Sequence, residues 1–321
     1  MAHTTLTAWS GAGNASEHHV FYHSAARKKR DIQKHALAIC LVVLLAFVVQ
    51  SAITVVGPSF SGSRLAASSS EPSLLSPKPP SPAIASVPVR ILEPPKDTTS
   101  PRLQALLDEW SVSHAQHQWA VKVEGLGNDN FSAGINTAVS FRSASIYKLY
   151  LTYSLFKKET PQTLQTKLDL VKCVDLMLRI SDNVCAETVG NYVGWASTDK
   201  LISAAGFSST KLALSTGPVS TPADTAVLLR GLYNGSLYNS QSRQYILDIL
   251  KVQTWRKGIP TGCGDCTVYN KTGDLGFVRH DAAIIETPVH KYVLSIFTDG
   301  ASYSEIAELA KQINDAINQP G

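Results

Sequence analysis

The sequence has little of what marks a metal-binding or nucleic-acid-binding protein. Five cysteines occur in 321 residues, and only Cys263 and Cys266 have the C-x-x-C spacing. A cysteine metal site would need all four cysteines beyond residue 100 to converge, so we expect no metal and no cofactor. Lysine and arginine form no basic stripe interleaved with aromatic residues, which argues against nucleic acid as a partner. We find no internal repeat.

Charge is wholly absent from residues 36–56, ALAICLVVLLAFVVQSAITVV. This apolar run is long enough to span a membrane as a helix. Five basic residues lie between positions 27 and 34, and none follows the run until Arg64. The positive-inside rule therefore predicts a single-pass anchor in the cell membrane, with residues 1–35 cytoplasmic and the rest extracytoplasmic. A cleaved signal peptide, cut near residues 65–68, is the alternative, but the run is too long for its apolar core.

Apolar residues are too sparse in residues 57–99 to form a core. This segment is rich in serine and proline, most clearly in SLLSPKPPSPAIASVPV, and it is typical of a flexible linker. Residues 100–321 are then predicted to form the globular domain. In the exported part disulfides can persist. Cys263 and Cys266 can close a tight turn, and Cys173 and Cys185 can join two adjacent helices, but the sequence leaves the pairing open.

The hydrophobic pattern of the domain predicts an α/β fold. Ser100 and Pro101 open a helix as N-cap and first residue. Two strands joined as a hairpin follow, then several helices, then three strands and a closing helix. The expected strands are 118–124, 131–137, 267–273, 281–287 and 291–298, and the later helices are 145–158, a run ending at 180, 221–232, 241–252 and 303–317. This order predicts one antiparallel sheet built from both ends of the domain, with the middle helices forming a second lobe.

A candidate nucleophile is one of four serines with a lysine three residues later. Context selects Ser145, because it follows a predicted strand and opens an apolar helix, where its hydroxyl lies at the positive end of the helix dipole. Lys148 lies on the same helix face and can act as its base when partly desolvated. Taken alone, an N-cap serine and a surface lysine would be the simpler explanation. The other matches are Ser154, Ser197 and Ser208.

Two further motifs follow in the chain. Ser181-Asp182-Asn183 lies between two predicted helices, where a loop can direct Ser181 and Asn183 into a cleft. Lys271-Thr272-Gly273 lies on a predicted strand, where the lysine and threonine can bind a carboxylate and the glycine leaves the strand edge clear. Each motif alone has an ordinary explanation, the first as a helix cap and the second as a surface strand that ends in a turn.

In this order the three motifs resemble those of the penicillin-recognising serine enzymes, and most nearly the class A β-lactamases. The segment 141–158 looks like the region around the active-site serine of that family almost residue for residue. The resemblance implies a β-lactamase/transpeptidase-like fold, with a five-stranded antiparallel sheet flanked by helices and a helical lobe. It also implies a monomer that acts on a β-lactam or a D-Ala-D-Ala-type peptide, and a part in antibiotic resistance.

The resemblance also assigns roles to residues. Ser145 would be acylated, Lys148 would be the base, and Ser181 would pass a proton to the leaving nitrogen. The oxyanion would bind the backbone N–H groups of Ser145 and Asp274. The other residues would contact the substrate. Asn183 would bind an acylamide group, and Lys271, Thr272 and Gly273 would form the strand that binds the carboxylate. Arg279, one residue out of register, would be a second arginine that binds the carboxylate.

Two departures from the family bear on turnover. The interval from Ser145 to Ser181 is shorter than in typical class A enzymes. Residues 200–223 contain no aspartate or glutamate, although class A enzymes place there the glutamate that activates the deacylating water. The segment 212–217, LALSTG, replaces that loop. General-base assistance contributes about two to four orders of magnitude, so deacylation should be slow unless another group, such as Glu187, Asp224 or Lys148, replaces the glutamate.

Three functions remain open on sequence grounds. The first is a membrane-anchored serine hydrolase that opens β-lactams. The second is a cell-wall D,D-peptidase or penicillin-binding protein that retains the acyl group. The third is a non-catalytic cell-wall binding module, against which the intact set of three motifs argues. The missing glutamate separates the first two.

Overall fold

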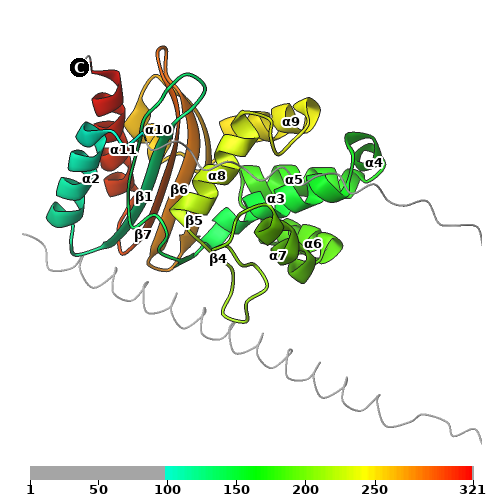
Figure 1. Cartoon of the computed structure of the whole chain (residues 1–321). Helices are drawn as coiled ribbons and strands as arrows, with labels where there is room; N and C mark the ends of the chain where they lie inside the picture. The colour runs from blue at the N-terminus through cyan, green and yellow to red at the C-terminus, as the bar shows by residue number, and fades with distance from the viewer. Residues whose placement is uncertain (1–97, 320–321) are drawn as a thin grey trace, which may run out of the picture. The chain divides into compact units, whose positions relative to one another are not determined.

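The computed structural model describes residues 98–319 (Figure 1). The predicted cytoplasmic segment 1–35, the span 36–56 and residues 57–97 of the linker lie outside the described residues. Among residues 98–319, no helix is both long and apolar enough to cross a bilayer.

A five-stranded antiparallel sheet forms the centre of the domain (Figure 1), and its strand order is β2-β1-β7-β6-β5. The predicted sheet built from both ends of the domain is confirmed, because β1 from the beginning pairs with β7 from the end. Strand β2 is shorter than predicted, since Asn136 adopts a left-handed φ of 51° just after it. The strands are β1 Gln118–Gly125, β2 Ser132–Ile135, β5 Thr267–Leu275, β6 Val278–Glu286 and β7 Lys291–Asp299.

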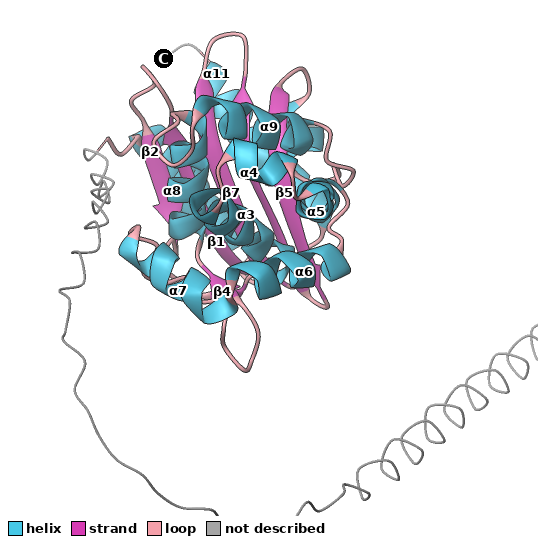
Figure 2. Ribbon diagram, turned by 90° about the vertical axis from the view of Figure 1, so that its right-hand side faces the viewer, coloured by secondary structure: helices cyan, strands magenta, loops and turns pink. Residues whose placement is uncertain are grey.

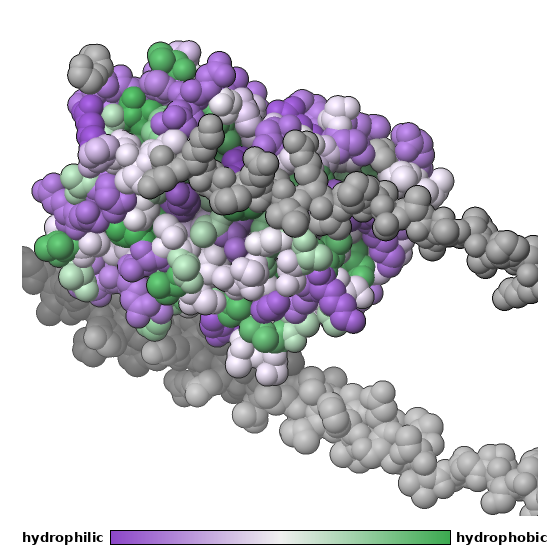
Figure 3. Space-filling view, viewed as in Figure 1, coloured by the Kyte–Doolittle hydropathy of each residue, from purple (hydrophilic) through white to green (hydrophobic). Residues whose placement is uncertain are grey.

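Helices cover both faces of the sheet, which explains why β6 and β7 are buried almost throughout. On one face lie α2 (Pro101–Ser113), α10 (Ile259–Cys263) and α11 (Tyr303–Asn318), and their apolar side chains join one core cluster with those of the sheet. Ser100 caps α2, accepting a hydrogen bond from Leu103 N at 3.4 Å, as predicted. The other face packs against α8 (Pro222–Tyr233) and the helical lobe. The outer surface seen in Figure 3 is mainly hydrophilic, with small separate apolar patches.

The helical lobe surrounds α3 (Tyr147–Lys158), as Figure 2 shows. Residues 148–155 of α3 are all buried, as expected of a helix with neighbours on every side. The sequence did not predict α4, α7 or α10, nor a two-stranded sheet of β3 (Phe141–Arg142) and β4 (Val219–Ser220). Helices α4 and α10 and the two short strands carry no periodic pattern, whereas α7, with 10 residues, was missed although it is almost as long as α6. The remaining helices are α4 Pro161–Gln165, α5 Leu168–Arg179, α6 Asn183–Val193, α7 Trp195–Ala204 and α9 Ser240–Lys251.

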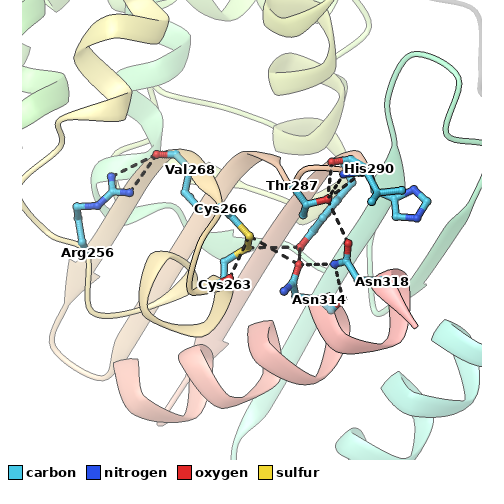
Figure 4. The surroundings of a disulfide bond; sticks show 10 residues. Arg256, Cys263, Cys266, Val268, Thr287, His290, Asn314 and Asn318 are labelled. Carbon is cyan, nitrogen blue, oxygen red and sulfur yellow. Dashed lines mark hydrogen bonds between the residues drawn. A yellow bond between two sulfur atoms is a disulfide. The ribbon is translucent and has the colours of Figure 1, made fainter. Parts of the chain in front are cut away.

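Two disulfides fix the pairing that the sequence left open. Cys173 of α5 bonds Cys185 of α6, so the bond links the two helices that flank the Ser181 loop. Cys263 bonds Cys266 and closes the turn between α10 and β5. Figure 4 shows this second bond beside Asn314 of α11. Among the described residues, no group of histidines, cysteines and carboxylates could hold a metal ion.

Candidate active site

Ser145 lies on a short 3-10 turn, Ala144–Ile146, that leads directly into α3. The helix therefore begins two residues later than the sequence predicted. Ala144 adopts a φ of 44°, a left-handed conformation that is uncommon for residues other than glycine. The turn is fastened at its start by Ser143 N, which donates to Pro218 O at 2.9 Å.

A buried histidine supports this turn from the sheet. Nε2 of His280 lies 2.9 Å from the carbonyl oxygen of Arg142, the last residue of β3, and a carbonyl can only accept. His280 is fully buried, its ring stacks on Phe297, and burial lowers its pKa to about 4. A neutral imidazole with its proton on Nε2 therefore anchors the strand that precedes Ser145. No motif in the sequence pointed to His280.

Lys148 is fully buried, so the alternative of a surface lysine is wrong. Its Nζ donates to Ser145 Oγ at 3.1 Å and to Asn183 Oδ1 at 2.8 Å, and it also donates to Ser181 O. Burial lowers the pKa of Lys148 to about 8, although the charge of Asp182 opposes the shift. An amine with this pKa is neutral in a useful fraction of molecules near neutral pH and can then accept the proton of Ser145.

The loop between α5 and α6 presents Ser181 in a strained conformation. Its φ is 62°, which is rare for a residue other than glycine and is typical of functional sites. Asp182 fixes the loop, because its Oδ1 accepts from Cys185 N at 2.7 Å as the N-cap of α6. The disulfide at Cys185 holds the same turn.

Lys271 lies fully buried on β5, and its Nζ donates to Ser181 Oγ and to Thr272 O. Burial lowers its pKa well below the usual value, and the nearby charge of Lys148 lowers it further. The two lysines thus bracket Ser181, since Lys148 contacts its carbonyl and Lys271 its hydroxyl. Lys271 is placed to supply Ser181 with a proton as well as to attract a carboxylate.

Gly273 also has a structural reason that the sequence did not predict. A Cβ here would lie 3.0 Å from both Ala144 Cβ and Ser143 O, so a glycine lets the nucleophile turn approach β5. The neighbouring Thr272 accepts a hydrogen bond at Oγ1 from Gln253 Nε2 at 2.9 Å. Because Gln253 donates to Thr272, the hydroxyl proton of the threonine is free to point elsewhere.

Arg279 lies opposite Asp274 in the register of β5 and β6. Its Nε is 3.8 Å from Asp274 Oδ2, and its Nη1 donates to Ala301 O at 3.1 Å. Arg279 therefore stands beside the site through its ion pair with Asp274, and it does not itself line the pocket described next.

A pocket of about 340 Å³ opens at these motifs. It brings together five of the predicted site residues, which are Ser145, Ser181, Asn183, Thr272 and Asp274. Three lining residues were not predicted, namely Ile180, Trp255 and Tyr303. Tyr303 donates to Gly273 O at 3.1 Å and so braces β5 beside Ser145. No local pattern marks these three, because they meet only in the folded chain.

A family model described as the beta-lactamase enzyme family matches residues 158–319, half of the chain. The chain belongs to this family. It is therefore a serine hydrolase of the β-lactamase type, and the predicted recognition is confirmed. The matched region includes the Ser181 and Lys271 motifs but begins after Lys148, so the Ser145–Lys148 pair is supported by its geometry. A search of curated proteins found no match.

Solved structures establish the fold. PBP-A is 20% identical with a TM-score of 0.60, covering 70% of this chain and 97% of that one. A mutant of PBP-A is known as an acyl-enzyme complex with penicillin G. A class A β-lactamase from Bacteroides cellulosilyticus DSM 14838 is 18% identical, with a TM-score of 0.58, over 67% of this chain and 98% of that one. The TLA-3 extended-spectrum β-lactamase is 18% identical, with a TM-score of 0.60, over 68% of this chain and 98% of that one. The β-lactamase/transpeptidase-like fold is thereby confirmed.

Carboxylates are scarce in the pocket of this β-lactamase-family enzyme. Of the eight residues of the described domain that line it, only Asp274 carries one. Asp224, considered above as a substitute base, is buried and accepts from Ser209 N at 3.0 Å and Thr210 Oγ1 at 2.8 Å. It serves the loop as a structural acceptor. Glu187 is exposed on α6 and is not among the lining residues.

The side chain of Asp199 holds the segment 212–217, which replaces the glutamate-bearing loop of the family. This carboxylate accepts from Leu212 N at 2.6 Å and from Ala213 N at 3.2 Å. Lys211 and Val219 pair across the base of the segment, and Gly217 turns it with a φ of 96°. The loop is therefore ordered by its own contacts, and it offers no carboxylate to a water molecule.

The pKa of Lys148 sets an expected pH dependence. The neutral amine accepts the proton of Ser145, and its fraction rises about tenfold per pH unit below the pKa. The rate of covalent labelling by a β-lactam should thus rise with pH and level off above about 8. The rate is measured by running the reaction at pH values between 6 and 9.5, quenching it at timed intervals and analysing the protein by mass spectrometry. Lys148→Arg, which cannot lose its charge, should react slowly with no such rise, and a flat wild-type profile would contradict Lys148 as the base.

Proposed function

We propose that this chain opens β-lactam rings through an acyl-enzyme at Ser145 and releases the product slowly. One observation carries the proposal, which is the contact of 3.1 Å between Ser145 Oγ and the buried Nζ of Lys148. A serine beside an amine of lowered pKa, at the rim of a pocket, is the arrangement of an activated nucleophile. Incubating the full-length protein with a penicillin tests it, since mass spectrometry should show the mass of one drug added to Ser145.

The contacts support the following acylation step. Neutral Lys148 takes the proton of Ser145 as Oγ bonds to the lactam carbonyl carbon. Backbone N–H groups of Ser145 and Asp274 stabilise the oxyanion, and β5 is suited to this because it is the edge strand of the sheet. The carbon–nitrogen bond of the ring then breaks, and the nitrogen takes the proton of Ser181. Lys271 restores that proton through its contact with Ser181 Oγ.

A second candidate is a cell-wall D,D-peptidase or penicillin-binding protein that retains the acyl group. The scarcity of carboxylates in the pocket favours it, because both peptide and β-lactam would acylate Ser145 while neither ester would find a strong base for hydrolysis. A D-Ala-D-Ala peptide offered in place of the drug separates the candidates. Release of one equivalent of D-alanine per enzyme molecule, faster than labelling by the β-lactam, would support the second candidate.

We propose, further, that the enzyme is a monomer anchored by residues 36–56 and held away from the membrane by the linker 57–99. The uncharged run and the basic residues before it support this orientation. Protease added to intact cells should remove the catalytic domain and spare the N-terminal segment. Recovery of the whole chain in the soluble fraction would contradict the anchor.

Lys271→Ala should weaken the capture of substrates that bear a carboxylate more than that of the matching neutral esters. A charge-assisted hydrogen bond contributes about 1.5–3 kcal/mol, so we expect roughly a 10- to 150-fold greater loss for the acid. Rates of labelling by a penicillin and its methyl ester measure the difference. The control is Lys291→Ala, which removes an exposed lysine on β7. Equal losses on both substrates would assign Lys271 to proton supply or structure alone.

A further inference from the structure

One wall of the active-site pocket is apolar and faces solvent. Ile180 is 41% exposed and Trp255 is 53% exposed, although both line the pocket. Thr254 N donates to Arg179 O at 2.9 Å, so the two segments that carry these side chains run side by side. Large apolar side chains left exposed together at a polar site are typical of ligand contacts.

The two lysines of the active site are withdrawn from the surface. Lys148 and Lys271 are fully buried, and their Nζ atoms are engaged by serine and asparagine oxygens. None of the eight lining residues in the described domain is basic, and Asp274 alone is acidic. A negative charge on a substrate's side chain would therefore meet no basic side chain among these lining residues and would lose hydration against the apolar wall.

We propose that Ile180 and Trp255 select β-lactams whose acyl side chain carries an uncharged aromatic group. This inference rests on the proposed acyl-enzyme function. Asn183, predicted to contact the acylamide of the substrate, lines the same pocket and lies three residues after Ile180. A group attached to that acylamide then extends onto the wall, where Trp255 offers an aromatic face and Ile180 a branched aliphatic one.

The test compares three penicillins that share one ring system on the full-length protein. Benzylpenicillin carries a phenyl group, carbenicillin adds a carboxylate to the same side chain, and 6-aminopenicillanic acid has no side chain. We expect labelling of Ser145 to be fastest with benzylpenicillin. Trp255→Ala should lower the ratio of the benzylpenicillin rate to the 6-aminopenicillanic acid rate about tenfold, and a circular dichroism spectrum that matches the wild type would show that the variant is folded.

Two variants serve as controls. Trp255→Phe keeps an aromatic face and should retain most of the preference. Phe277→Ala removes an aromatic residue that is 77% exposed but does not line the pocket, and it should leave the ratio unchanged. An unchanged ratio in Trp255→Ala, or faster labelling by carbenicillin than by benzylpenicillin, would overturn the inference and leave the proposed function intact. Absence of labelling by all three drugs would instead overturn the proposed function.

Discussion

Replacing Ser145 by alanine should abolish covalent labelling by any β-lactam, and Lys148→Ala should slow it at least about 100-fold. The first change removes the only atom proposed to bond the substrate. The second removes the buried amine whose contact with Ser145 Oγ supplies the base, and general-base assistance has about this magnitude. Mass spectrometry of the intact protein after mixing with benzylpenicillin gives both rates.

The chain offers a matched control for these variants. Ser208 and Lys211 repeat the Ser-x-x-Lys spacing, but neither lines the active-site pocket, and Ser208 is exposed. Ser208→Ala and Lys211→Ala should label at the wild-type rate. Labelling that persists in Ser145→Ala would contradict the assignment of the nucleophile, and peptide mapping of the adduct would then identify the residue that reacts.

Hydrolysis of a chromogenic cephalosporin should show a burst of one equivalent followed by a slow phase. Acylation groups are assembled at Ser145, whereas among the lining residues of the described domain only Asp274 could assist water. Steady-state turnover should therefore fall well below the usual enzyme range of about 1–10³ per second. Stopped-flow absorbance at several enzyme concentrations measures the amplitude of the burst and the slow rate together.

Fast multiple turnover by the wild type would contradict slow deacylation. It would require Asp274, Lys148 or a group outside the pocket to activate water, and Glu187→Gln tests the last of these. Because Glu187 is exposed and does not line the pocket, this variant should leave both phases unchanged. Placing a glutamate within 212–217 is the reverse experiment, although Asp199 holds that short segment in its own position.

The sequence predicted the sheet and the longer helices because their patterns are local. Amphipathic spacing shows α9 and α11, and both capping residues of α2 are visible at Ser100 and Pro101. The burial of Lys148 and Lys271 could not be predicted in this way. A lysine inside a motif looks the same in sequence whether it faces solvent or a serine from another element.

The site residues that were missed share this non-local origin. Ile180 and Trp255 become neighbours only when the end of α5 meets the segment after α9. His280 reaches Arg142 across more than a hundred residues of chain. The need for glycine at position 273 likewise arises from the approach of the nucleophile turn to β5, and neither partner is near it in sequence.

The bond between Cys173 and Cys185 makes the mobility of the Ser181 loop depend on whether these two cysteines have been oxidised. Helices α5 and α6 can pack while both thiols are reduced and Asp182 caps α6, but oxidation adds a covalent bond across the loop that carries Ser181. A copy kept in a reducing cytosol would thus hold its core while its proton donor moved more freely. The export proposed above would place this oxidation in a compartment where disulfides persist.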